Sequence, residues 1–154
     1  MGDKKPVFWL KCAFMVGVIT DALALIPMLC PPMAKFFWGF DGFTGIYYFA
    51  MGYGATFMLA WTLLLYWAFR RPLERSHVAL LTILVLVGFM VTETVSIREG
   101  YILASKALPS LILQAAWLIL FGYAFMISRS ARSSANGNGE GKYIVSPLGK
   151  KLVG

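Results

Sequence analysis

Residues 78–97 read VALLTILVLVGFMVTETVSI, a run with a single charged side chain, that of Glu93. The hydrocarbon core of a bilayer is about 30 Å thick, and a helix needs about 20 residues to cross it. This stretch is therefore predicted to be a membrane-spanning helix.

Three further stretches have the same length and apolar character, at approximately residues 7–29, 45–69 and 108–127. Helix-breaking or charged residues separate the four stretches, at Pro31-Pro32, Arg70-Arg71-Pro72 and Arg98-Glu99-Gly100. Because the connections are short, consecutive helices are expected to be antiparallel and adjacent. We therefore predict an all-α fold in which residues 1–128 form a four-helix transmembrane bundle.

The composition of the 154-residue chain supports this prediction, with 59% hydrophobic and 14% charged residues. Soluble domains are about 45–50% apolar and about 25% charged. A soluble fold of this size would leave a large apolar surface in water. The composition therefore argues against a soluble enzyme, a nucleic-acid-binding domain and a disulfide-stapled secreted module. With one histidine, His77, and no cluster of acidic residues, no metal or other cofactor is expected.

The 14 Lys and Arg residues predict the orientation, because short cytoplasmic loops retain positive charge. In a four-span protein both termini and the second loop lie on the same side. That side carries eleven of the basic residues, and the other carries three, Lys35, Arg98 and Lys106. We therefore predict that both termini are cytoplasmic in a cell (inner) membrane. The net charge of +7 is then explained by basic residues that interact with the surface of the lipid bilayer, and no nucleic-acid partner is expected.

Two carboxylates lie inside the predicted spans, Asp21 and Glu93. A charge near the bilayer centre costs at least about 2.5–3.5 kcal/mol, so such residues are candidates for function. Asp21 is 14 residues beyond Val7, and Glu93 is 15 residues beyond Val78, so both reach a similar depth in the outer half of the membrane. The two acids are therefore candidates for one shared site.

The second and fourth spans place polar side chains at the same depth, among them Tyr53, Thr56 and Gln114. The inner half of the bundle is nearly all apolar, which favours a dead-end pocket over a continuous ion path. We therefore predict an outward-facing polar pocket whose ligand-binding residues are Asp21, Glu93, Tyr53, Thr56 and Gln114. In the alternative interpretation the acids are protonated or hydrogen-bonded within the bundle, or neutralised by basic residues at the outer mouth, and merely fix the helix register. No nucleophile and base pair accompanies them, so no catalytic residue is predicted and the chain is not expected to be an enzyme.

Small residues are expected to bring the helices together on the faces that carry Asp21 and Thr56. Gly17, Asp21 and Ala24 share a face of the first span, and Gly52, Thr56 and Ala60 form a small-xxx-small ridge on the second. Such ridges let helix backbones approach closely in a membrane. Both are therefore predicted to face the interior of the bundle.

Residues 129–154 differ in composition from the spans, being rich in Ser, Gly, Asn and basic residues. They are predicted to form a flexible basic cytoplasmic tail. The apolar patch from Tyr143 to Gly149 is a candidate docking segment for a membrane-protein partner. Because a four-helix unit this small often associates, a homo-oligomer is a second candidate assembly.

One sequence resemblance can be stated. The run MGYGATFMLAWTLLLYW at residues 51–67, followed by RPLER at 71–75, resembles the central signature of small prokaryotic four-span integral membrane proteins with no assigned function. The run Thr20-Asp21-Ala22-Leu23, with Pro27 and Pro32, is similar to theirs as well. The resemblance implies four spans and the inner membrane, and it implies nothing about chemistry.

Two functional hypotheses follow from these observations. In the first, the bundle holds a small lipophilic or cationic ligand in its outward-facing pocket, with a role in transport as one form of this hypothesis. In the second, the protein is a structural or accessory subunit of a larger membrane complex and has no chemistry of its own.

Overall fold

The computed structural model of the protein describes residues 4–40 and 42–140, and these residues form α-helices and no strand. In chain order the helices are α1 (Lys4–Leu29), α2 (Pro31–Trp38), α3 (Gly45–Arg70), α4 (His77–Arg98) and α5 (Ala104–Glu140). The prediction of an all-α fold is therefore confirmed for the part of the chain that the structure describes.

Four of the helices are long and apolar enough to cross a membrane. The candidate spans are Lys5–Leu29, Gly45–Arg70, His77–Arg98 and Ala104–Ser130, close to the predicted boundaries. Large apolar side chains cover their outer surfaces: Ile46 is 81% exposed, Ile119 73% and Met126 69%. Such a surface is stable against lipid tails and would aggregate in water, as expected for an integral membrane protein.

The short helix α2 was not predicted. Pro31 and Pro32 end α1, but they also occupy the first positions of α2, where a missing N–H is tolerated. The helix ends at Gly39, whose φ of 75° gives the left-handed conformation that favours glycine. The aromatic segment after α1 is therefore a helical turn packed on the bundle rather than a plain loop.

Helix α5 is longer than the predicted fourth span, because its backbone remains helical to Glu140. The first part of the segment predicted to be a flexible tail is thus helical. Extending an existing helix adds one hydrogen bond per residue without a new nucleation cost, which favours this continuation. The candidate docking segment from Tyr143 to Gly149 lies outside the described residues.

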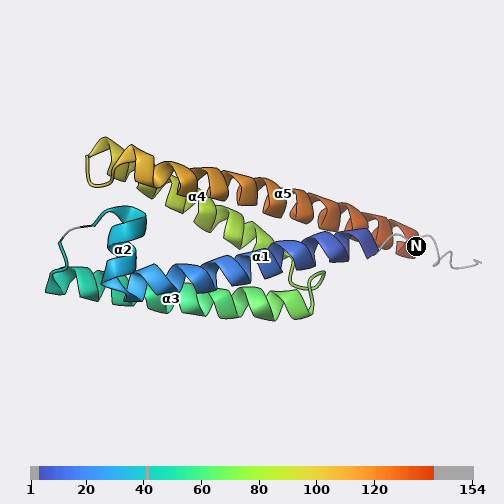
Figure 1. Cartoon of the computed structure of the whole chain (residues 1–154). Coiled ribbons are helices and arrows are strands. Elements are labelled where there is room, and N and C mark those ends of the chain that lie inside the picture. The colour runs from blue at the N-terminus through green and yellow to red at the C-terminus, as the bar shows by residue number, and fades with distance from the viewer. Residues whose placement is uncertain (1–3, 41, 141–154) are drawn as a thin grey trace, which may run out of the picture.

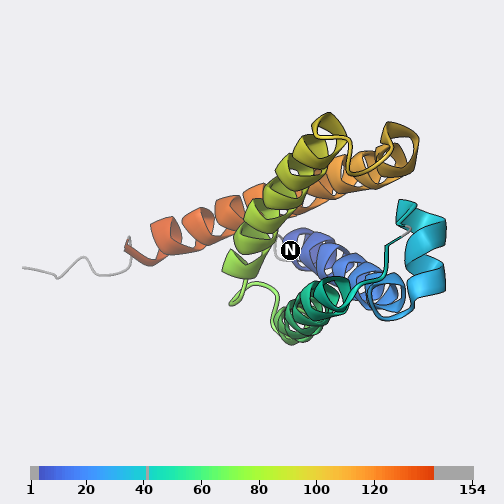
Figure 2. The same ribbon diagram turned by 90° about the vertical axis from the view of Figure 1, so that its left-hand side faces the viewer.

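The long helices are arranged as two hairpins (Figures 1 and 2). Helix α1 packs along α3, α4 packs along α5, and α1 also contacts α5. By contrast, α3 and α4 diverge, although only residues 71–76 connect them. The expectation that all consecutive spans are adjacent is therefore wrong for this pair, because a short connection fixes only the helix ends that it joins.

The start of α1, the α3–α4 connection and the end of α5 lie at one end of the bundle (Figure 1). We call this the terminal end, and the opposite end the loop end. At the terminal end the connection is held by Arg75, which stacks 3.5 Å from the centre of the Trp67 ring and donates a hydrogen bond to the Trp67 carbonyl oxygen. Arg71 pairs with Glu74 at 3.3 Å. Basic side chains therefore cluster where α3 turns into α4.

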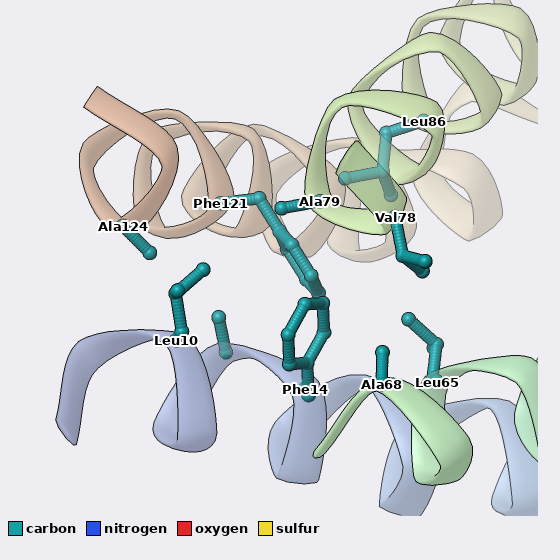
Figure 3. Close-up of a cluster of buried hydrophobic side chains, with 10 residues drawn as sticks. Leu10, Phe14, Leu65, Ala68, Val78, Ala79, Leu86, Phe121 and Ala124 are labelled. Atoms are coloured by element: carbon teal, nitrogen blue, oxygen red, sulfur yellow. The ribbon is translucent and has the colours of Figure 1, made fainter. Parts of the chain in front are cut away.

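The hydrophobic core lies toward the terminal end, where the two hairpins converge (Figure 3). Phe14 of α1, Leu65 of α3 and Phe121 of α5 are almost fully buried in it. Gly17 permits this close packing, since a Cβ atom there would lie 2.9 Å from Leu65 Cδ1 and 3.3 Å from Phe121 Cζ. The prediction that Gly17 faces the interior of the bundle is thus confirmed.

The predicted ridge of Gly52, Thr56 and Ala60 has a different position. All three residues are exposed, and a Cβ atom added at Gly52 would meet nothing within 4 Å. Helix α3 instead turns Gly54 toward Met28 of α1 and buries Leu65. The prediction that this ridge faces the interior is therefore wrong, because both faces of a membrane helix are apolar and the pattern does not distinguish them.

Candidate functional site

A cavity of about 480 Å³ lies between the two hairpins. All four candidate spans contribute to its walls. Ligand sites for small molecules commonly have volumes of about 300–1,000 Å³. The cavity is therefore large enough for one small organic molecule.

The hydrophobic core closes one end of this cavity. Leu65, Leu86 and Phe121 line the cavity and also belong to the core cluster, in which each is at most 4% exposed. The packed side chains leave no room there for a water-filled path. The cavity is thus a dead end on the side of the core.

Aromatic rings form much of the wall. Phe57 and Trp61 come from α3, Phe89 from α4, and Trp117 and Phe121 from α5. Met28 and Met58 add flexible thioether side chains that can adapt to an irregular shape. The wall is therefore suited to an apolar or aromatic molecule.

Among the described residues that line the cavity, Asp21 is the only charged one. It lies one turn after Gly17 on α1, and its side chain is partly buried. Among the described residues, its carboxylate has neither a hydrogen-bond partner nor an ion-pair partner. The neighbouring Thr20 does not supply a partner, because its hydroxyl donates to the carbonyl oxygens of Val16 and Gly17. Asp21 thus brings an uncompensated carboxyl group to an otherwise apolar wall.

Glu93 has a different environment, in a cluster that joins α4 to α5. Ser110 Oγ donates to Glu93 Oε1 at 2.7 Å, and Gln114 Nε2 donates to the same oxygen at 2.9 Å. Gln114 Nε2 also lies 3.0 Å from Ser110 Oγ. Glu93 Oε2 and Gln114 Oε1 are buried without a hydrogen-bond partner among the described residues. The cluster therefore acts as a polar tie within one hairpin, and Glu93 is not among the residues that line the cavity.

The structure thus separates the predicted site residues. It brings Glu93 and Gln114 together, and it places Asp21 in the cavity, with no hydrogen bond between the two acids. Tyr53 is 60% exposed, and its ring lies next to those of Phe49 and Phe57. Thr56 is also exposed, and its hydroxyl donates to the Gly52 carbonyl oxygen. Neither Tyr53 nor Thr56 lines the cavity.

Among the wall residues that were not predicted from the sequence are Trp61 and Trp117. Trp is usually enriched at the two membrane interfaces. Trp61 and Trp117 instead lie in the middle of long apolar helices, at a distance from either end. That unusual position is the signal that could have identified them.

Lys106, one of the basic residues expected at the outer mouth, makes its contacts with α2. Its Nζ atom donates to the Phe36 carbonyl oxygen at 3.0 Å and lies 5.7 Å from the centre of the Phe36 ring. Lys106 therefore ties α5 to α2 and does not neutralise Asp21 or Glu93.

Comparisons of the chain with protein-family models, with curated proteins and with solved structures find no match. The resemblance to small prokaryotic four-span membrane proteins therefore stays a prediction. What the geometry establishes is an all-helical chain with four candidate membrane spans and a cavity between two hairpins.

Proposed function

We propose that this protein is an integral membrane protein that binds a small lipophilic ligand in the cavity between its hairpins. The observation that carries the proposal is the cavity itself, with its volume of about 480 Å³ and its largely aromatic and aliphatic lining. Ligand sites are typically apolar cavities with a few polar groups that fix orientation. Here the charged group is Asp21.

The divergence of α3 and α4 supports an entry route from the lipid. These two helices contact each other only weakly, whereas α1 packs along α3 and α4 along α5. A lipophilic molecule dissolved in the bilayer would enter between α3 and α4 and stop at the core residues Leu65 and Phe121. Binding is therefore favoured over a permanently open path, and a transport cycle would need the core to separate.

We further propose that the terminal end of the bundle faces the cytoplasm of the cell (inner) membrane. The support is the charge distribution, since Lys5, Arg70, Arg71 and Arg75 lie at this end. Basic residues in short connections are retained on the cytoplasmic side. In this orientation the cavity lies around the middle of the spans, and Asp21 lies just to the outer side of the midpoint of α1.

A photolabelling experiment tests the proposed cavity. Benzophenone reacts preferentially with methionine side chains, and Met28 and Met58 line the cavity whereas Met126 is 69% exposed on the outside. In the purified protein, we expect labelling of Met28 and Met58 to saturate and to be displaced by excess diphenylmethane, a photo-inert analogue. Labelling of Met126 is expected to rise linearly with probe concentration.

Two matched variants complete this test. Val85 lines the cavity, and Val85→Trp should block it and abolish saturable labelling. Leu84 is the neighbouring residue and is 69% exposed, so Leu84→Trp should leave the labelling unchanged. Labelling of Met28 and Met58 that neither saturates nor responds to Val85→Trp would refute the proposed function.

A second candidate function is that of an accessory subunit in a larger membrane complex. It is favoured by the exposed stripe of Gly52, Thr56 and Ala60 on α3, because small residues allow a helix of another chain to approach closely. Gly52→Leu should then release co-purifying membrane proteins, or dissociate a homo-oligomer, while saturable photolabelling persists. An unchanged assembly state in mild detergent would argue against this function.

A further inference from the structure

We infer that the ligand of the cavity is a lipophilic cation, with the Asp21 carboxylate as its counterion. This inference rests on the proposed function and names the chemical class of the ligand. It concerns a protonated amine, a quaternary ammonium or a phosphonium ion that carries apolar substituents.

The first argument is the charge of the wall. Among the described residues, Asp21 is the only charged one that lines the cavity, and no Lys, Arg or His side chain pairs with it. An ionised carboxylate in an apolar setting is costly unless a positive charge compensates it. A neutral ligand would leave this cost in place, and an anionic ligand would increase it.

The second argument is the aromatic lining. Five aromatic residues surround the cavity, including Trp61 and Trp117. The face of an aromatic ring attracts an organic cation, and Trp does so most strongly. A carboxylate combined with several ring faces therefore recognises a diffuse positive charge that is shielded by apolar groups.

The third argument is that Lys11 and Lys106 make their contacts elsewhere. Lys11, on the same helix as Asp21, places its Nζ atom 5.6 Å from the centre of the Phe69 ring at the terminal end. Lys106 is bound to the Phe36 carbonyl oxygen. Since neither lysine lines the cavity, a bound cation would supply the positive charge that the protein itself does not place beside Asp21.

Three probes of nearly identical shape test this inference: tetraphenylphosphonium, neutral tetraphenylmethane and anionic tetraphenylborate. Each is added as a competitor to the benzophenone labelling of Met58 in the purified full-length protein. We expect tetraphenylphosphonium to displace the label at a concentration at least tenfold lower than tetraphenylmethane. Tetraphenylborate is expected to be the weakest competitor.

Variants of the two intramembrane acids identify the counterion. Asp21→Asn should remove the preference for the cation and leave competition by tetraphenylmethane unchanged, whereas Asp21→Glu, which keeps the charge, should retain it. Glu93→Gln is the matched control, because it neutralises the other acid outside the cavity, and it should behave as the wild type.

The outcomes separate the inference from the proposed function. Equal competition by the cation and the neutral probe, or an equal loss of cation preference in Asp21→Asn and Glu93→Gln, would overturn the inference while saturable labelling still supports a cavity for neutral ligands. Failure of saturable labelling in the wild type would instead overturn the proposed function together with this inference.

Discussion

The substitution Gly17→Ala probes the contact on which the core and the floor of the cavity depend. The added methyl group would lie 2.9 Å from Leu65 Cδ1 and 3.3 Å from Phe121 Cζ. Both side chains are at most 1% exposed and belong to the core cluster, so moving either one away from Gly17 disturbs its other core contacts. Overpacking of this kind costs about 1–3 kcal/mol. Replacing a mid-helix glycine by alanine stabilises a helix by about 0.5–1 kcal/mol. The expected net loss of unfolding free energy is therefore about 0–2.5 kcal/mol.

Two glycines of another helix, Gly52 and Gly54 of α3, provide matched controls. A Cβ atom at Gly52 would meet nothing within 4 Å, so Gly52→Ala should be neutral or stabilising by about 0.5 kcal/mol. At Gly54 the Cβ atom would lie 2.8 Å from Met28 Cε, the end of a flexible side chain, so the stability of Gly54→Ala should lie between those of the other two variants. The order of stabilities is therefore Gly52→Ala above Gly54→Ala above Gly17→Ala.

The assay is equilibrium unfolding of each purified variant in mixed micelles, with increasing mole fraction of a denaturing detergent. The free energy of unfolding is compared with that of the wild type at the same micelle composition. If Gly17→Ala proves as stable as Gly52→Ala, then Leu65 and Phe121 do not press on α1. The described convergence of the two hairpins would then be refuted.

Three further predictions concern the tie within the second hairpin, the membrane topology and the short helix α2. A double-mutant cycle of Gln114→Leu and Glu93→Leu, measured by unfolding, should give a coupling free energy of about 0.5–2 kcal/mol between the two positions, because Gln114 Nε2 donates to Glu93 Oε1. Additive losses of stability would show that this hydrogen bond does not stabilise the hairpin. In a Cys12→Ser variant, the exposed Cys30 should react with an impermeant maleimide added to intact cells, and labelling only after permeabilisation would reverse the proposed orientation. Lys106→Met should accelerate amide hydrogen exchange across α2, because the hydrogen bond to the Phe36 carbonyl oxygen is lost. The free energy of global unfolding should change by less than about 0.5 kcal/mol. Unchanged exchange would show that this lysine does not hold α2.

The spans were predictable because their length is imposed by the bilayer and their apolar runs are uninterrupted. The helix α2 was not, since Pro31-Pro32 is as compatible with the end of one helix as with the start of another. The divergence of α3 and α4 was also beyond the sequence, because it depends on how side chains of both hairpins pack far from residues 71–76.

At the candidate site, the depth of each residue in the membrane was predictable from the sequence, but the direction of its side chain was not. The depth of a residue follows from the rise of about 1.5 Å per residue, and Glu93 and Gln114 do meet across two helices. The direction of a side chain does not follow, because lipid and the bundle interior are both apolar. Tyr53 and Thr56 therefore share the depth of the polar groups and yet lie on the exposed face of α3. Trp61 and Trp117, by contrast, line the cavity, and only their position far from the helix ends sets them apart in the sequence.

The most direct test of the central claim is an experimental structure in lipid nanodiscs with tetraphenylphosphonium present. Our account predicts density for one bound molecule between the hairpins, beside Asp21 and the rings of Trp61 and Trp117. It also predicts that Glu93 remains bonded to Ser110 and Gln114 outside the cavity. A closed interface between the hairpins, with Asp21 hydrogen-bonded to another residue of the bundle, would contradict the account, as would a helix of a second chain in the place of the ligand.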